Sequence, residues 1–573
     1  MSGRNKKTNP TGKDFWIKLL CGFLGILMVL GTVVMVLSTF EMHAEDDKTA
    51  KTETSEQISV GIAYGNDLLP TYTVTADGGF SIGIPTQNNK KEIFEYDAKK
   101  ISVAVCDNLY KSSLGYESNP DRLTAIGGYH LQVSSFSFKT GSDVSGDNPV
   151  SFFPGASSGA GSGAIVGYTK SAVYEKIEDL NKSGILEQNN VYAYPVYNNG
   201  MYFIRIGDFS TEDEVGLLKD SLSKNLSLNS SIISPGDGSV SIVDYESDRI
   251  LISFLGNENR PICVTPRTGN SFGDNDSTSY YGHMDFEFIN GKFSVINTLS
   301  LEDYIKCILP INVSYKNDIQ FLKLFSVILR TKAMYNSSLH EEHGFDVCTG
   351  FHCSAYHGRN FENTITSEAV DATKSVVITY DGKPINPVYN VAAGATTASC
   401  IDVFGKDVPY LRAVSKADKE FDQWTFTKTQ NDIYNALVSA GYTEVKANVD
   451  SIKINSYGEG SEYVTSVTFT DILGNTLTVE GSDKIFKALG SALPSTAFCV
   501  GKAGETVQKI TYVNGERTTE SIHLEGKYGE FVFVGCGSGN GLGLSYMGAL
   551  EDISSGMTYA DVISKYYSGV KLS

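Results

Sequence analysis

The stretch that decides the fold of this chain is Leu301-Glu-Asp-Tyr-Ile-Lys-Cys-Ile-Leu-Pro310, followed by Ile319-Gln-Phe-Leu-Lys-Leu-Phe-Ser-Val-Ile-Leu-Arg-Thr-Lys-Ala333. The first segment predicts a helix that its proline ends. The second is so strongly apolar that its composition alone predicts a helix buried in a core. We therefore expect these two helices at the centre of the domain.

Strand signals lie on both sides of the two helices. Met284 to Phe293 reads as strand around the turn Asn290-Gly291, a dipeptide typical of β-hairpins. From about Ser375 the pattern returns to strands and turns, and it ends in a helix around Tyr559–Tyr567. Residues 248–573 are accordingly predicted to form one mixed α/β domain.

The region before this domain is predicted to be rich in short β-strands. Ile58 to Ile84 alternates apolar and polar residues, and further strand signals lie at Ile101–Val105 and His130–Phe138. Gly141 to Gly167 is rich in glycine, serine and proline, which is typical of a loop. We place this β-rich region at residues 58–168.

A βαβ-type unit is predicted next, at residues 169–230. Helical spacing over Ser171–Asn181 is followed by the strand signals Tyr192–Tyr197 and Met201–Ser210, and then by a helix that ends at Leu226. The pattern R-I-G-x-F-S-T-x-x-E in this unit resembles the SPOR fold, which binds glycan strands stripped of peptides. The alternative is a generic βαβ unit without a ligand.

Composition excludes some classes of function. The 573 residues carry 47 basic and 66 acidic side chains, a net charge of −19 with histidine neutral. Nucleic-acid binding needs clustered lysine and arginine, so no nucleic-acid partner is expected. Nine cysteines are too few for a disulfide scaffold of this length.

An uncharged stretch of 22 residues, Leu19 to Phe40, is long enough to cross a bilayer as a helix. Lysine and arginine precede it and acids follow it, so we expect a cytoplasmic tail (1–18), a transmembrane helix (19–40), a linker (41–57) and an extracytoplasmic remainder. The alternative is a cleaved signal peptide, whose apolar region is normally shorter. The predicted fold class is thus α+β, with a single N-terminal transmembrane helix, a β-rich region and a mixed α/β domain.

The order and spacing of motifs in residues 248–573 resemble the SpoIID/LytB family (stage II sporulation protein D). That family carries L-x-x-Y-L-x-G-V-x-P-x-E-M-P, then L-K-A-Q-A-V-A-A-R-T-Y, and later G-x-G-x-G-H-G-V-G-M-S-Q-x-G-A. Further matching segments are Cys353 to Gly358, Val388 to Thr396 and Gly535 to Ala549. The matching positions in the first two motifs are Leu301, Tyr304, Pro310, Leu322, Lys323, Val327, Arg330 and Thr331.

The resemblance implies a membrane-anchored lytic transglycosylase that acts on peptide-free peptidoglycan strands. Such chemistry needs one carboxyl group, which protonates the glycosidic oxygen and then takes a proton from the sugar 6-hydroxyl. The family places that glutamate two residues after the proline, where this chain has Asn312. An amide does not titrate near neutral pH, so the resemblance implies a scaffold that keeps the fold and has impaired or no lytic activity.

Three further polar positions depart from the family motifs. Ser354 replaces a glutamine, and Asn540 and Tyr546 replace a histidine and a glutamine. The glycan-binding residues implied by the resemblance are Asn312, Arg330, Ser354, Tyr356, Asn540 and Tyr546. Two alternatives stay open: Asn312 is an ordinary polar loop residue, or one of Glu302, Asp303 and Asp318 acts as a relocated acid.

A candidate metal site lies between the helices and the later strands. His343, Cys348, His352 and Cys353 fall within eleven positions, and two imidazoles with two thiolates form the donor set of structural zinc sites. His340 and His357 are spare ligands. The alternative is two buried cysteines or one disulfide beside exposed histidines.

Three hypotheses of function follow. The first is a glycan-binding protein of sporulation or cell-wall remodelling, with peptidoglycan strands, the membrane and other cell-wall or engulfment proteins as partners. The second is an active lytic transglycosylase that uses another carboxylate. The third is a structural envelope protein that binds a protein partner.

Overall fold

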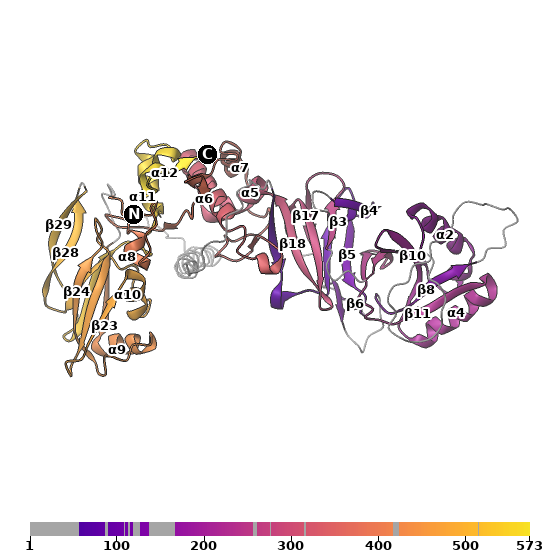
Figure 1. The fold of residues 1–573 in the computed structure, drawn as a ribbon, viewed down its shortest axis with the longest axis horizontal. Coiled ribbons are helices and arrows are strands. Elements are labelled where there is room, and N and C mark those ends of the chain that lie inside the picture. Colours follow the sequence, from indigo (N-terminus) through magenta and orange to yellow (C-terminus); the bar gives the residue numbers. More distant parts are fainter. Residues whose placement is uncertain are drawn as a thin grey trace, which may run out of the picture.

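The computed structural model describes residues 57–85, 90–107, 109–112, 115–118, 126–136, 167–255, 261–274, 277–314, 317–415, 423–513 and 515–573. These residues form an elongated molecule in which three helices, α5, α6 and α7, lie between a seven-stranded sheet and a C-terminal unit (Figure 1). The predicted tail, the predicted membrane span Leu19–Phe40 and most of the glycine-rich loop lie outside the described residues.

The predicted fold class requires a correction. The described residues form a strand-rich mixed α/β structure, and none of their helices is both long and apolar enough to cross a membrane. The longest of these helices, α6 (Ile319–Tyr335), has 17 residues, fewer than the roughly 20 that a bilayer requires. Most of its apolar side chains are buried within the protein instead.

The seven-stranded sheet has the order β19-β1-β18-β17-β14-β3-β4. Its turn between β17 and β18 has positive φ at both Asn290 (48°) and Gly291 (80°), as a type I′ hairpin requires. The sheet comprises β1 (Gln57–Ala63), β3 (Phe80–Pro85), β4 (Lys90–Tyr96), β14 (Ile262–Pro266), β17 (His283–Ile289), β18 (Lys292–Ser300) and β19 (Val347–Cys348).

The first strand of this sheet comes from far away in the sequence. β1 lies between β18, to which it is antiparallel, and β19, to which it is parallel. The predicted boundaries at residues 58, 169 and 248 therefore do not separate independent sheets. One face of the sheet carries core residues such as Met284 and Phe286, and Phe286 contacts Tyr72 of the neighbouring sheet.

The ten-stranded sheet has the order β11-β8-β10-β9-β13-β12-β5-β2-β15-β16. Its strands are β2 (Thr71–Thr75), β5 (Lys100–Val105), β8 (Tyr129–Phe136), β9 (Ala193–Asn198), β10 (Met201–Phe209), β11 (Leu228–Ile233), β12 (Val240–Asp244), β13 (Ile250–Phe254), β15 (Ser271–Asp274) and β16 (Ser279–Tyr281). A separate hairpin pairs β6 (Leu109–Ser112) with β7 (Gly115–Ser118).

The predicted βαβ unit lies within a larger βαββαβ arrangement inside the ten-stranded sheet. Its chain order is β8, α2 (Lys170–Lys182), the short α3 (Ile185–Gln188), β9, β10, α4 (Glu212–Leu226) and β11. The antiparallel spatial order β11-β8-β10-β9 is that of a split βαβ fold. The resemblance to a SPOR module stays a prediction.

The central helices pack against helices from the C-terminal end of the chain. They are α5 (Leu301–Asn312), α6 and α7 (Thr364–Asp371), with α11 (Tyr546–Ser554) and α12 (Tyr559–Tyr566) packed against α6. Pro310 lies in the last turn of α5 and the helix ends two residues after it. Short strands accompany these helices: β20 (Ile378–Tyr380), β21 (Lys383–Pro384), β22 (Tyr389–Asn390), β31 (Leu544–Ser545) and β32 (Lys571–Leu572).

The C-terminal unit has a hydrophobic core of its own, centred on residues such as Phe469 and Phe533. Its strands are β23 (Gln423–Thr429), β24 (Val449–Tyr457), β25 (Val464–Asp471), β26 (Thr476–Glu480), β27 (Phe498–Lys502), β28 (Thr506–Val513), β29 (Glu516–His523) and β30 (Glu530–Cys536). Its helices are α9 (Gln430–Ser439) and α10 (Ser482–Ala488). The short α8 (Cys400–Phe404) contacts α10, but its buried residues belong to the larger core of the rest of the protein.

Candidate functional site

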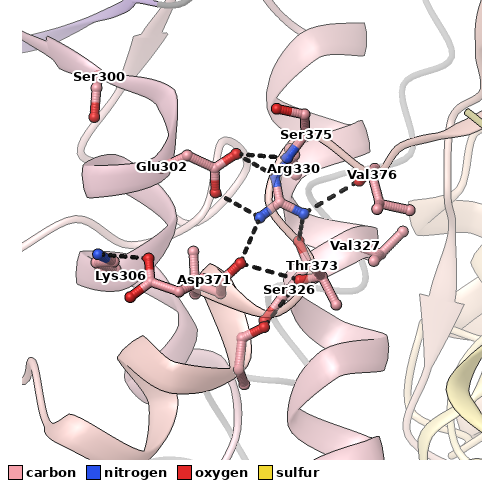
Figure 2. A network of polar contacts seen from close by, with 12 residues as sticks. Ser300, Glu302, Lys306, Ser326, Val327, Arg330, Asp371, Thr373, Ser375 and Val376 are labelled. Carbon is pink, nitrogen blue, oxygen red and sulfur yellow. Dashed lines mark hydrogen bonds and ion pairs between the residues drawn. The ribbon is translucent and has the colours of Figure 1, made fainter.

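A buried ion pair joins the first turn of α5 to α6. The Arg330 guanidinium donates from Nε to Glu302 Oε1 at 3.0 Å and from Nη2 to Glu302 Oε2 at 2.6 Å. It also donates to the carbonyls of Ser326, Val370 and Val376, while the Ser375 amide donates to Glu302 (Figure 2). The arrangement connects α5, α6, α7 and the turn that follows α7.

The Arg330 side chain is 0% exposed and its donors are directed to protein acceptors. A glycan could not reach it in this structure, which corrects the predicted glycan contact. Glu302 is one of the three carboxylates considered as a relocated acid, and both of its oxygens accept hydrogen bonds from Arg330. The role that the contacts support for Arg330 and Glu302 is to hold the helices together.

Asn312 lies at the opposite end of α5, in a group of amide and aromatic side chains that we call the Asn312 cluster: Asn312, Asn317, Phe321, Phe325, Tyr389 and Tyr546. Its Nδ2 donates to the Ile308 carbonyl at 2.9 Å, and its Oδ1 accepts from the Tyr389 hydroxyl at 3.2 Å. These two contacts fix which way the amide faces. Asn312 is therefore a positioned residue, not a loosely held loop side chain.

Tyr546 completes the Asn312 cluster from the start of α11. Its hydroxyl accepts from Asn317 Nδ2 at 3.3 Å, and its ring centroid lies 4.9 Å from that of Phe321 and 5.3 Å from that of Phe325. Phe325 also contacts Tyr389 edge-on at 5.2 Å. The two amides and the two tyrosines are half-buried and lie over the fully buried rings of Phe321 and Phe325. Amides beside aromatic rings are a mixture that lines many ligand sites.

The polar groups of the Asn312 cluster are uncharged at neutral pH. Burial, and then the neighbouring Tyr546 phenol, raise the pKa of Tyr389 to about 12. Burial also raises the pKa of Tyr546. Because amides do not titrate either, the cluster can donate and accept hydrogen bonds but cannot exchange a proton with a sugar near pH 7.

The other two carboxylates considered as an acid are engaged at helix ends. Asp303 accepts from the Ser300 hydroxyl at 2.7 Å in the first turn of α5, away from Asn312. Asp318 accepts from the Gln320 amide at 2.7 Å and caps α6. Asp318 follows Asn317 directly, so it is the one of the three next to the Asn312 cluster in the chain.

The hydrogen bonds of the remaining predicted glycan contacts go to residues outside the Asn312 cluster. Tyr356 is buried, and its hydroxyl donates to Asn297 Oδ1 at 2.6 Å inside the core, which corrects its predicted role. Ser354 is only 3% exposed and has φ of 105°. Asn540 is half-buried and its Oδ1 accepts from the Leu542 amide at 3.0 Å, an interaction within the glycine-rich loop.

A Cys/His cluster, formed by His340, Cys348, His352 and Cys353, lies beside β19. One ligand atom from each of the four residues falls within 4.8 Å of the others. His340 Nε2 is 3.2 Å from His352 Nε2 and 3.3 Å from Cys353 Sγ, and the two cysteines are free thiols. His340, a spare ligand in the sequence analysis, thus takes the place predicted for His343.

His343 lies outside this set. Its imidazole is 38% exposed and stacks with His340 and Phe345. The short turn Glu341–His343 separates the two histidines and directs only the first toward the thiols.

The Cys/His cluster fits a tetrahedral metal site. Two sulfurs and two imidazole nitrogens are the donor set of structural zinc. The Gly350 amide donates to Cys348 Sγ at 3.2 Å, and a Cβ at Gly350 would lie 3.2 Å from that sulfur, so the backbone closes around it. A hydrogen bond with Cys353, opposed by burial and aided by His352, holds the pKa of Cys348 well below its usual range, which favours the thiolate that binds metals.

Sequence reasoning missed Tyr389 and Asn317. Tyr389 lies in the matching segment Val388 to Thr396, so its motif was visible, but its contact with Asn312 joins positions 77 residues apart. Asn317 carries no motif signal, because it lies in the connection between α5 and α6.

Comparisons with known proteins agree with the motifs. The sequence profile of SpoIID, described as stage II sporulation protein, matches residues 289–380. An uncharacterized protein of Brachyspira hyodysenteriae is 24% identical over 388 residues, which cover 67% of this chain and 95% of that protein.

A second relative carries a functional name. The amidase enhancer of Bacillus subtilis is 25% identical over 246 residues, 37% of this chain and 33% of the enhancer, so the match spans about a third of that relative. The SpoIID profile covers α5, α6 and α7, the elements that carry Arg330 and Asn312. These matches confirm the predicted resemblance to the SpoIID/LytB family, with the SpoIID domain matched at residues 289–380.

Proposed function

We propose that this protein binds peptidoglycan glycan strands at the Asn312 cluster without cleaving them. The SpoIID match and the amidase enhancer relative indicate a role in sporulation or cell-wall remodelling. The observation that carries the finer proposal is the hydrogen bond from the Tyr389 hydroxyl to Asn312 Oδ1, at the position where the family has its acid. Donors, acceptors and ring faces remain there to bind a sugar, while the proton-transferring group is missing.

Binding and cleavage are tested with the full chain and denuded glycan strands. We expect the wild-type protein to sediment with the strands and to release no anhydro ends. Tyr546→Ala should weaken sedimentation, because it removes a ring and a hydroxyl from the Asn312 cluster. Release of anhydro products by the wild type would contradict the proposal and favour an active enzyme, for which Asp318→Asn is the first variant to test.

The variant Asn312→Glu restores the family acid. General acid catalysis typically contributes about 10²–10⁴-fold to a rate, so detectable strand cleavage should appear if the rest of the site is intact. Asn189→Glu is the matched control, because Asn189 Nδ2 also donates to the carbonyl four residues earlier, Ile185, in a helix remote from the cluster. Cleavage by both variants would show a contaminant rather than a restored site.

We also propose that the Cys/His cluster holds a structural zinc ion. His340, Cys348, His352 and Cys353 would be its ligands, and the ion would order the loop between β19 and Tyr356. Metal analysis of the purified protein should find zinc that Cys348→Ser loses. His343→Ala is the control and should keep it; equal loss in both variants, or no zinc in the wild type, would contradict this assignment.

The third hypothesis, a structural protein with a protein partner, remains the outcome if neither binding nor cleavage is found. The predicted location at the cell membrane stays a prediction.

A further inference from the structure

A second group of side chains that can bind metals lies on the seven-stranded sheet. All of its members precede residue 289, where the match to the SpoIID profile begins. Cys263 on β14 is in register with Asp285 on the neighbouring β17, and His283 lies two residues before Asp285 on the same strand. Because side chains two apart share one face of a strand, all three project to the same side. One ligand atom from each lies within 4.8 Å of the others.

These side chains lie on the opposite face of the sheet from Met284 and Phe286, on the face that also carries Ile296 of β18. Met284 and Phe286, which alternate with them along β17, are fully buried in the apolar core. Cys263 is buried at 2% exposure, whereas the side chains of His283 and Asp285 are 25% and 13% exposed, so the group reaches solvent through His283 and Asp285. An ion could therefore enter without opening the core.

One carboxylate oxygen of Asp285 is held by contacts, whereas the other has no hydrogen-bond partner among the described residues. Its Oδ2 accepts from the Thr298 hydroxyl at 2.7 Å and lies 3.3 Å from His283 Nε2. Its Oδ1 is buried and has no hydrogen-bond partner among the described residues. A buried carboxylate oxygen without a partner is costly, and a cation is one group that would satisfy it.

The chemistry of the three donors selects the kind of ion. A thiolate and an imidazole favour zinc-class transition metals over magnesium or calcium, which prefer all-oxygen sites. This group offers three protein ligands, whereas the Cys/His cluster offers four. A tetrahedral ion bound here would therefore keep one position for water or another ligand.

We propose that Cys263, His283 and Asp285 bind a zinc-class divalent ion at a second, three-ligand site with one open position. Thr298 is the residue that orients the Asp285 carboxylate toward the ion. The site is separate from the Cys/His cluster and from the Asn312 cluster, and it does not depend on the proposed glycan binding.

The experiment adds zinc chloride to the metal-free full-length protein and measures bound zinc by elemental analysis. Cys263→Ser should bind one zinc fewer than the wild type, and Cys348→Ser should lose its own, different equivalent. Cys499→Ser, a buried strand cysteine outside both groups, should equal the wild type. Each site is scored by its own variant, so failure of one assignment leaves the other testable.

Thr298→Val is a second variant, needed in case Cys263→Ser loses zinc only because it misfolds. It keeps the shape of the side chain and removes only the hydrogen bond to Asp285, and loss of such a supporting contact typically weakens metal affinity about 10–100-fold. We expect that loss for the equivalent assigned to Cys263, with an unchanged circular dichroism spectrum. Unchanged stoichiometry in Cys263→Ser, or unchanged affinity in Thr298→Val, would overturn the proposal.

Discussion

The two ends of helix α5 use polar residues in opposite ways. At its start, Glu302 and Arg330 form a buried charged pair with hydrogen bonds to three backbone carbonyls. At its end, Asn312 belongs to a half-buried group without formal charge. The helix therefore carries a structural ion pair and a candidate binding group about 15 Å apart, at 1.5 Å per residue.

The comparison shows that a motif position does not define a role. Arg330 and Asn312 both fall on family motifs, and the sequence presents both as candidate glycan contacts. Burial distinguishes them, since one is sealed among protein acceptors and the other lies beside aromatic rings at a partly open surface.

The largest effect is expected at the charged end. Arg330→Met leaves Glu302 without its partner, and breaking a buried pair typically costs about 3–5 kcal/mol. Urea unfolding of the full chain measures this loss. The double variant Glu302→Leu, Arg330→Met should recover most of it; a loss below about 1 kcal/mol in the single variant would show that the pair is not structural.

A smaller effect is expected at the uncharged end. Tyr389→Phe removes the donor to Asn312 Oδ1, and the net value of one such bond is about 0.5–1.5 kcal/mol, which is roughly a 2–10-fold loss of glycan affinity if Asn312 contacts the sugar. Sedimentation with denuded strands measures it. Tyr202→Phe, which removes a hydroxyl bonded to the Ile93 carbonyl far from the cluster, should leave affinity unchanged.

A still smaller effect is expected one turn along α5 from Glu302. Lys306 forms an ion pair with Asp371 at 2.8 Å, but the Asp371 side chain is 61% exposed (Figure 2). Exposed pairs contribute about 0–1 kcal/mol, so Lys306→Met should change the free energy of unfolding little. A loss as large as that of Arg330→Met would mean that exposure does not separate the two pairs.

The smallest effect is expected from pH. A phenol whose pKa rises to about 12 on folding keeps its proton, and the Tyr389 hydrogen bond, until the pH approaches that value. Its contribution is complete below the ordinary tyrosine pKa of about 10 and is lost only as the pH rises through the folded value. Glycan binding should therefore be flat from about pH 5 to 9, whereas Asn312→Glu should introduce a pH dependence with its carboxyl.

Much of the local structure was predictable because it depends on short-range signals. The hairpin at Asn290-Gly291 follows from the backbone freedom of that dipeptide. Helix α4, predicted to end at Leu226, begins with a capping box between Thr211 and Glu214, which is a local signal of the sequence. The family resemblance likewise rested on ordered motifs, and the profile match agrees with it.

The contacts that give residues their roles were harder to predict from the sequence. Glu302 and Arg330 meet across 28 positions, so spacing could not show that the arginine is sealed by a partner. The choice of His340 over His343 depends on how one short turn packs against the thiols. Cys263 and Asp285 meet only through strand register, which no single segment defines.

The position of β1 has a consequence for how the protein is made. This strand pairs with β18, whose first residue follows about 230 positions later, and with β19 beyond it. At about 5–20 residues per second, a growing chain would carry β1 for on the order of 10–50 s before either neighbour exists. During synthesis its unpaired backbone is open to wrong strands, so the nascent chain has a period of vulnerability that the finished protein does not share.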